Sequence, residues 1–264
     1  MKAKKSLGQH FLKSEKALSQ ILDAGDVHAD DIVLEIGPGQ GALTERLLAL
    51  AGKVIAIEKD AALIPFLQEK FAKEIAEGRL DIVEKDILKF DTEDLRFYKR
   101  PYKLIANIPY YITGAIIEQF LSAAYQPERM VLLIQKEVAE RMVAKDRKQS
   151  VLSVAVGVYG APKVVAKVPA GAFTPPPKVD SAIISIEGIS RVFFDTISEQ
   201  HFFDLVKTIF GKKRKQLGGS LSEYIEDKEK ARKILQIVGI SEKARPETLS
   251  KEQWKAVVKT IETL

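Results

Sequence analysis

Short apolar segments alternate with stretches of helical periodicity through the first half of the chain. Between the apolar segments, leucines recur at helical spacing, as at Leu43, Leu47 and Leu50. This alternation is typical of a parallel sheet whose two faces are covered by helices. We expect the strands at residues 32–36, 53–57, 80–83, 103–106 and 130–134.

The pattern changes after residue 150. Residues 163–168 and 179–186 predict two further strands, joined by the turn-rich stretch 169–177, and this ending favours an antiparallel hairpin that closes the sheet. The apolar run 151–159 fits a helix or a strand, because a run this short shows no decisive period.

From about residue 190 the apolar spacing is helical to the end of the sequence. Ser250, followed three residues later by Gln253, resembles a capping box that begins the last helix. The predicted fold is therefore a Rossmann-like α/β domain over residues 1–189, mostly parallel with a C-terminal antiparallel hairpin, and a small all-helical domain over residues 190–264.

Composition narrows the possible classes of protein. A chain of 264 residues can bury a large core without crosslinks, and the absence of cysteine excludes disulfides, thiolate metal sites and cysteine nucleophiles. The basic start of the sequence is not followed by the apolar stretch of a signal peptide, and no apolar run approaches the length of a membrane span. We expect a cytoplasmic, monomeric protein with no membrane partner and no metal.

Positive charge is concentrated near the C-terminus. The formal net charge is +5, and residues 190–264 carry 15 Lys+Arg against 11 Asp+Glu. Clustered cations favour a polyanionic partner such as RNA, although a solvated helix face has the same composition. The candidate RNA-binding residues are Lys212, Lys213, Arg214 and Lys215.

A glycine-rich loop follows the first predicted strand. Gly37 and Gly39 stand between that strand and the next helix, where they allow a ligand to approach the backbone. Glu58 ends the second strand about 20 residues later, where a carboxylate can accept hydrogen bonds from both hydroxyls of a ribose. Together these residues predict a nucleotide cofactor, which both a dehydrogenase and a methyltransferase would bind.

Residues at the ends of the next two strands separate these classes. Asp86 follows the third strand and Asn107 the fourth, at the sheet edge where ligands bind, and Asp86 is placed to accept a hydrogen bond from an adenine amino group. The three histidines, His10, His28 and His201, lie away from these strand ends, so no acid–base partner is available for a nicotinamide.

The segment Asn107-Ile108-Pro109-Tyr110 fits the methylation of an amine. The amino nitrogen of adenine is a poor nucleophile because its lone pair is delocalised into the ring. The Asn107 side-chain oxygen and the Ile108 carbonyl can each accept one amino hydrogen, while Pro109 keeps both acceptors rigid, so positioning replaces a strong base. Tyr110 can stack on a base that has been swung out of its helix or loop.

These motifs resemble the ribosomal RNA adenine dimethylase family over nearly the whole chain. Residues 5–12 are similar to its N-terminal signature, which implies that His10 and Leu12 lie beside the cofactor. Residues 173–182 resemble a second signature, which implies that Phe173 stacks on the target base opposite Tyr110.

The resemblance also implies a cofactor and a substrate. S-adenosylmethionine would contact Gly37, Glu58, Asp86 and Asn107. The Rossmann-like domain predicted above would then be an S-adenosylmethionine-dependent methyltransferase domain. The substrate would be two adjacent adenosines in a hairpin near the 3′ end of small-subunit rRNA, each dimethylated at N6 within an assembling subunit. Gly218-Gly219 departs from the family, which usually has asparagine nearby, and His10 stands where many relatives have asparagine.

Several alternatives remain. An antibiotic-resistance methylase of large-subunit rRNA shares the glycine loop and the Asn-Ile-Pro-Tyr segment, but its relatives resemble residues 8–12 and 244–250 less. A mitochondrial transcription-factor relative would carry a transit peptide, which we do not expect here. An RNA chaperone or assembly factor without essential turnover would have no need for the intact motif at Asn107.

Overall fold

The protein is described by a computed structural model in which residues 4, 7–98, 100–144, 149–212 and 215–264 are placed. Its contacts divide the chain into two compact units. The first contains residues 1–140 and 160–189, and the second contains residues 141–159 and 190–264. We predicted one boundary, at residue 189, whereas residues 141–159 group here with the C-terminal helices.

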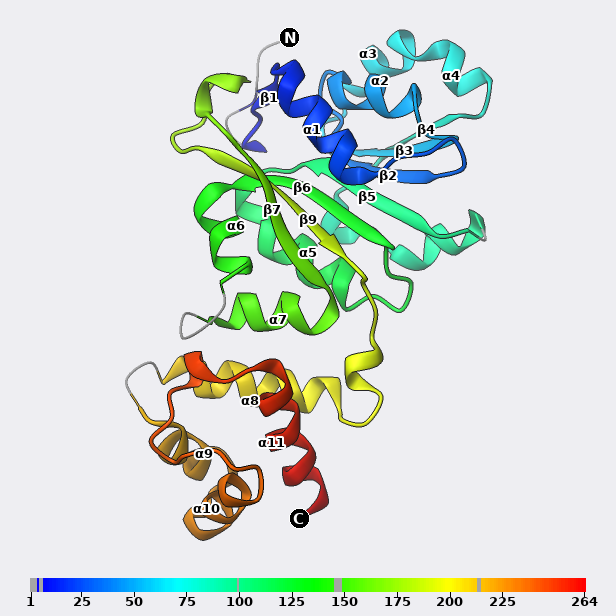
Figure 1. The fold of residues 1–264 in the computed structure, drawn as a ribbon. Helices are drawn as coiled ribbons and strands as arrows, with labels where there is room; N and C mark the ends of the chain where they lie inside the picture. Colours follow the sequence, from blue (N-terminus) through cyan, green and yellow to red (C-terminus); the bar gives the residue numbers. More distant parts are fainter. Residues whose placement is uncertain (1–3, 5–6, 99, 145–148, 213–214) are drawn as a thin grey trace. The chain divides into compact units, whose positions relative to one another are not determined.

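A seven-stranded mixed sheet forms the first unit (Figure 1), with the strand order β4-β3-β2-β5-β6-β9-β7. The strands from β4 to β6 are parallel, and β9 pairs antiparallel with both β6 and β7. The predicted parallel sheet with an antiparallel end is therefore confirmed. The strand bounds are β2 Ile32–Ile36, β3 Lys53–Glu58, β4 Leu80–Glu84, β5 Tyr102–Asn107, β6 Arg129–Gln135, β7 Ala161–Val168 and β9 Ser181–Glu187.

Both faces of this sheet are apolar, as expected for strands covered on both sides. Alternate strand residues, among them Val33, Ile105 and Val131, join one core with Leu18 of α1 and Leu47 of α2. Residues of opposite parity are equally buried and face the other side, where Figure 1 shows α5 behind the strands. The helices of this unit are α1 Glu15–Gly25, α2 Ala42–Leu48, α3 Ile64–Lys70, α4 Ala72–Ala76, α5 Thr113–Leu121 and α6 Lys136–Met142, whose last two residues fall in the second unit.

A two-stranded ribbon brings the beginning of the chain to the carboxyl ends of the parallel strands. In it β1 (Phe11–Leu12) pairs antiparallel with β8 (Phe173–Thr174). The ribbon joins the two segments that resemble family signatures, although they are separated by more than 150 residues of sequence.

The second unit is helical. Its helices are α7 Val151–Tyr159, α8 Glu199–Gly211, α9 Leu217–Ile225, α10 Lys228–Ile237 and α11 Lys251–Thr263. Residues 151–159, whose conformation the sequence left open, are thus a helix. The capping box that begins α11 is present, because Ser250 Oγ accepts from Gln253 N while Gln253 Oε1 accepts from Ser250 N. Trp254 of the same helix is fully buried.

The two glycines that depart from the family lie in the first turn of α9. A Cβ on Gly218 would lie 2.9 Å from the Cβ of Glu242, and the Gly218 N–H donates to the Glu242 carbonyl at 2.9 Å. The missing side chain therefore allows the start of this helix to lie directly against the loop before residue 244. Of the basic run, Lys213 and Arg214 lie outside the described residues.

Within the placed ranges, no helix combines the length and apolar character needed to cross a bilayer.

A glycine in the turn before β3 provides a test of this packing. A Cβ on Gly52 would lie 2.3 Å from the Ala29 carbonyl oxygen, a backbone atom that cannot move aside by side-chain rotation. We predict that Gly52→Ala lowers the free energy of unfolding by about 1–3 kcal/mol, the usual cost of overpacking. Chemical denaturation would measure this change.

The matched control is Gly114→Ala in α5, where a Cβ meets no atom within 4 Å. That variant should be neutral or stabilised by up to about 1 kcal/mol, because alanine is the better helix former. Equal stability of the two variants would show that the turn at Gly52 relaxes freely.

Candidate active site

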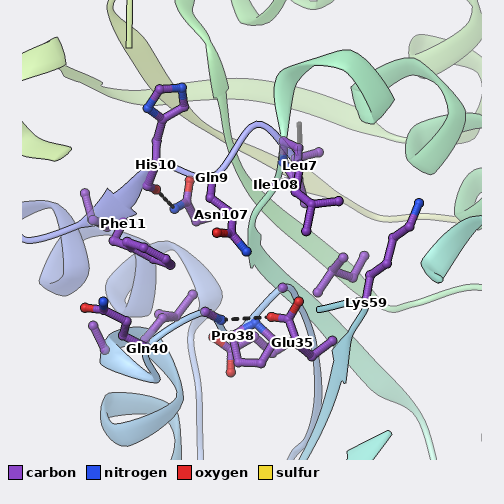
Figure 2. Close-up of a pocket in the computed structure, with 18 of the residues that line it drawn as sticks. Leu7, Gln9, His10, Phe11, Glu35, Pro38, Gln40, Lys59, Asn107 and Ile108 are labelled. Carbon is purple, nitrogen blue, oxygen red and sulfur yellow. Dashed lines mark hydrogen bonds between the residues drawn. The ribbon is translucent and has the colours of Figure 1, made fainter. Parts of the chain in front are cut away.

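A cavity of about 480 Å³ lies at the carboxyl ends of the parallel strands. Its walls come from the loops after β2, β3, β4 and β5 and from residues 7–13 near the N-terminus (Figure 2). Ten of the predicted site residues line it: His10, Leu12, Gly37, Gly39, Glu58, Asp86, Asn107, Ile108, Pro109 and Tyr110. Residues separated by up to 100 positions therefore share one site.

The glycine loop and Glu58 form one side of this cavity. Gly37 and Gly39 both have left-handed backbone conformations, with φ of 67° and 59°, and no atom lies within 4 Å of the place where a Gly37 Cβ would stand. Glu58 Oε2 accepts from the Gly39 N–H at 3.2 Å, and Oε1 accepts from the Asp60 N–H at 2.8 Å. Burial raises the pKa of Glu58, and these backbone hydrogen bonds oppose that rise.

Asp86 lines the cavity and forms an ion pair. Its Oδ2 is 2.8 Å from Lys59 Nζ, and its Oδ1 accepts from the Leu88 N–H at 3.2 Å. The hydrogen bond from Lys59 is the main reason that the pKa of Asp86 lies below its ordinary value. The carboxylate is therefore ionised at neutral pH and can accept further hydrogen bonds.

The amide of Asn107 is oriented by the N-terminal segment. Its Nδ2 donates to the backbone carbonyl of His10 at 3.1 Å, as the dashed line in Figure 2 shows. Because a carbonyl can only accept, this bond identifies the amide nitrogen and leaves Oδ1 as the free acceptor. Ile108, the next residue, is buried and is followed by Pro109, so the backbone here is held firmly.

Tyr110 is anchored at its hydroxyl group and its ring contacts His10. The hydroxyl lies 2.6 Å from Ser181 Oγ, and burial raises the pKa of this tyrosine. The Tyr110 and His10 rings are stacked, with centroids 6.2 Å apart and an interplanar angle of 22°. His10 Nδ1 is 2.7 Å from the Pro175 carbonyl oxygen and must carry a proton to donate to it.

Phe173 is placed differently from the other predicted residues. It is only 3% exposed, pairs with Leu12 in the β1–β8 ribbon and packs in the hydrophobic core with Val168. In this conformation its ring is part of the core and not of the cavity wall. Its stacking on a target base stays a prediction that requires this ring to move.

Two carboxyl groups near the site were not predicted. Glu35 lines the cavity, is 1% exposed, and its Oε2 has no hydrogen-bond partner among the described residues. Burial, with a further contribution from Glu58, raises its pKa to about 8. Asp60 is 5% exposed and contacts the N-terminal segment. An acidic residue inside the apolar strand 32–36 was the available signal for Glu35, whereas Asp60 has no comparable signal.

Comparison with known proteins identifies the family. The family model described as "Ribosomal RNA adenine dimethylase" matches residues 1–263. The chain belongs to the ribosomal RNA adenine dimethylase family. One relative, the "Ribosomal RNA small subunit methyltransferase A" of Dehalococcoides mccartyi, is 47% identical over 97% of this chain and 87% of its own length. The protein of the same name from Alkaliphilus metalliredigens is 39% identical over 97% and 91%.

Solved structures agree with this assignment. A dimethyladenosine transferase from Plasmodium falciparum has a TM-score of 0.82 and 28% identity, covering 96% of this dimethylase and 98% of its own chain. The "23S rRNA methyltransferase ErmE" has a TM-score of 0.73 and 25% identity, covering 96% and 99%. The predicted family and fold class are confirmed, and the likeness to both structures shows that overall fold alone does not select the substrate.

The buried Glu35 gives a pH-dependent prediction for the dimethylase without cofactor. Its folded-state pKa of about 8 exceeds the ordinary 4.5, so its contribution to stability is complete below about pH 4.5 and is lost as pH rises through about 8. The Glu35→Gln amide cannot ionise. Thermal unfolding between about pH 5 and pH 9 should therefore show a smaller loss of melting temperature in the variant than in the parent.

Glu69→Gln, at an exposed position of α3, is the control and should lose stability with pH as the parent does. If Glu35→Gln and the parent lose the same amount, the carboxyl of Glu35 is ionised in the folded protein and the assignment is wrong.

Proposed function

We propose that this protein transfers methyl groups from S-adenosylmethionine to the N6 amino groups of adenosines in small-subunit rRNA. The observation that carries the proposal is the orientation of Asn107, which lines the same cavity as Glu58 and the glycine loop and whose Oδ1 accepts no hydrogen bond from the described residues. Family membership and the names of the relatives at 39–47% identity support the same activity.

The residues of the cavity fit this cofactor. About 480 Å³ lies within the range of roughly 300–1,000 Å³ typical of small-molecule sites. Glu58 would accept hydrogen bonds from the ribose hydroxyls, Asp86 would accept one from the adenine amino group, and Gly37 leaves room for the cofactor to approach the backbone. The bound cofactor supplies an electrophilic methyl group on a sulfonium. His10, Leu12 and Gly39 complete the proposed contacts.

The chain's own contribution to catalysis is the alignment of the amine. Asn107 Oδ1 and the Ile108 carbonyl would each accept one N6 hydrogen, which draws the nitrogen from planar toward tetrahedral geometry and frees its lone pair. The bond from Asn107 to His10 and the ring of Pro109 prepare these acceptors before substrate arrives. A nitrogen that has gained a methyl group is cationic and acidic, so its proton leaves without a strong base.

Tyr110 would hold the extracted base by stacking. Its hydroxyl bond to Ser181 fixes the ring plane, and His10 lies beside one face of that ring. Phe173 would complete the sandwich after leaving its place in the core.

The finer details of the substrate rest on the family resemblance. They are the dimethylation of two adjacent adenosines in the 3′-terminal hairpin loop and an assembling small subunit as substrate. A cytoplasmic location and a monomeric enzyme are also part of the proposal, and they rest on the sequence analysis. The likeness to ErmE keeps large-subunit rRNA as a second candidate. The third candidate, from the sequence analysis, is an assembly role without essential turnover. Labelled S-adenosylmethionine offered with unmodified small or large subunits distinguishes all three by which particle, if either, becomes labelled.

The described cations of the basic run are already paired. Lys212 and Lys215 both form ion pairs with Glu223 of α9, and the hydrogen bonds from these lysines lower the pKa of Glu223 to about 2. Phosphate groups of RNA would compete with this carboxylate for the same lysines. Their proposed role in RNA binding therefore includes release from Glu223.

We predict that Asn107→Ala lowers the single-turnover rate of methyl transfer by about a hundredfold or more, the scale for loss of one preorganised polar group. Rapid-quench assays at saturating cofactor and unmodified subunits would measure the rate, and equilibrium binding would show that RNA is retained. Tyr110→Phe removes the bond to Ser181 but keeps the stacking ring, so its rate should fall much less than that of Asn107→Ala. An unchanged rate in Asn107→Ala would show that the amine is aligned by other groups.

Because Glu223 pairs with both lysines, substitutions of the lysines and of Glu223 should change RNA affinity in opposite directions. Replacing Lys212 and Lys215 together by alanine should weaken RNA binding and reduce the salt dependence of log K by about 2, whereas Glu223→Gln should strengthen binding by freeing both lysines. Filter binding over a salt series would measure both effects. An unchanged slope in the double variant would mean that these lysines contact no phosphate.

A further inference from the structure

The N-terminal segment, meaning Lys4 and residues 7–13, lies over the cavity and is held from several sides. Phe11 contacts the glycine loop, since a Cβ on Gly39 would lie 3.0 Å from the Phe11 ring. The Lys13 N–H donates to the Ala172 carbonyl at 2.9 Å. The carbonyl of His10 accepts from Asn107. The position of this segment therefore decides both how the cavity is covered and how the Asn107 amide is oriented.

Asp60, two residues after β3, makes the polar attachment of this segment to the sheet. Lys4 Nζ donates to Asp60 Oδ1 at 2.6 Å, and Gln9 Nε2 donates to Asp60 Oδ2 at 3.1 Å. Gln9 Oε1 in turn accepts from the Lys4 N–H at 2.8 Å. These bonds join parts of the chain 51 and 56 residues apart.

The electrostatics of Asp60 show that it acts as a carboxylate. Its side chain is 5% exposed, and such burial opposes ionisation, but the hydrogen bonds from Lys4, Gln9 and the Ala62 N–H outweigh it and lower its pKa. Ala62 donates to Oδ1 at 3.1 Å, which keeps the side chain in one rotamer. A buried ionised group with every oxygen bonded is expensive to leave unpaired, so it holds its partners strongly.

We propose that Asp60 is a positioning residue that keeps the N-terminal segment closed over bound cofactor and aligned with Asn107. Asp60 is not among the residues that line the cavity, so it acts through Gln9 and His10, which do. The same turn also serves the cofactor site directly, because the Asp60 N–H donates to Glu58 Oε1. The turn at Asp60 thus has two roles. Its backbone N–H orients the Glu58 carboxylate, the proposed ribose ligand, and its side chain holds the N-terminal segment.

Two consequences distinguish this role from general stability. The segment forms one wall of the cavity, so the contacts that hold it slow the escape of a ligand bound beneath it. When the segment lifts, the His10 carbonyl leaves Asn107 Nδ2 and the amide can rotate. Loss of the attachment should therefore shorten cofactor residence and lower the methyl-transfer rate by more than any change in the stability of the cofactor-free protein explains.

The test uses the full-length protein with radiolabelled S-adenosylmethionine, chased with excess unlabelled cofactor. Asp60→Asn should release label about tenfold faster than the parent. The Asp60 carboxylate oxygen accepts a hydrogen bond from Gln9 Nε2, whereas the amide of the variant would place an N–H donor against that donor. Lys4→Met should give a similar change. The double variant Gln9→Glu with Asp60→Asn restores one acceptor and one donor across the contact, and should recover most of the residence time.

The control is Asp81→Asn, which removes a carboxylate bonded to Lys53 near the other end of β4, away from the cavity. It should leave the release rate unchanged. Release from Asp60→Asn within twofold of the parent overturns the proposal. So does equal acceleration in Asp81→Asn, or a fall in melting temperature that accounts for the whole effect, or a double variant that recovers nothing.

The role proposed for Asp60 rests on the proposed function only in the choice of cofactor. Failure of that role and failure of the proposed function give different results. If the parent protein retains no labelled S-adenosylmethionine at all, the proposed function fails. If the parent retains it and Asp60→Asn retains it equally well, only the role of Asp60 fails.

Discussion

Parallel pairing of the four strands from β4 to β5 is the constraint on which the rest of this structure depends. Hydrogen bonding in register places Ile36 beside Ile57, and Glu58 beside Glu84. The polar residues that follow each strand are thereby collected at one edge, with their side chains and backbone groups directed into a common space. A single cavity results, although its walls come from segments spread over a hundred residues.

The balance between burial and hydrogen-bond donors then decides the charge of each acidic group there. Glu58 and Asp60 are buried but bonded to backbone or side-chain donors, whereas Glu35 has an oxygen without a partner and takes the protonated form up to about pH 8. Asp86 is kept ionised by Lys59. Glu35 and Asp86 line the same cavity and thus differ in charge because their donors differ, and a cationic cofactor would meet both forms in one site.

Much of this arrangement could be predicted because its signals are local. The periodicity of residues 32–134 indicated the strands, and the positions of Glu58, Asp86 and Asn107 at strand ends indicated that they would converge. The capping box at Ser250 needs only four residues. Residues 151–159 could not be assigned from their short apolar run. Phe173 was expected by resemblance to stack on the target base opposite Tyr110, and this stays a prediction, because in this structure Phe173 pairs with Leu12 and packs in the core.

The amino-acid sequence by itself determined the order of strands and helices, the polar groups at the strand ends and the membership of the family, since each depends on residues close together in the chain. Only the tertiary structure decided which donors each carboxyl group receives, that Asn107 is oriented by the carbonyl of His10, and that Asp60 holds the N-terminal segment. The contacts of Asn107 with His10 and of Asp60 with the N-terminal segment join residues 51 to 97 positions apart. No periodicity or motif encodes such pairs, because they exist only once the sheet has brought the segments together.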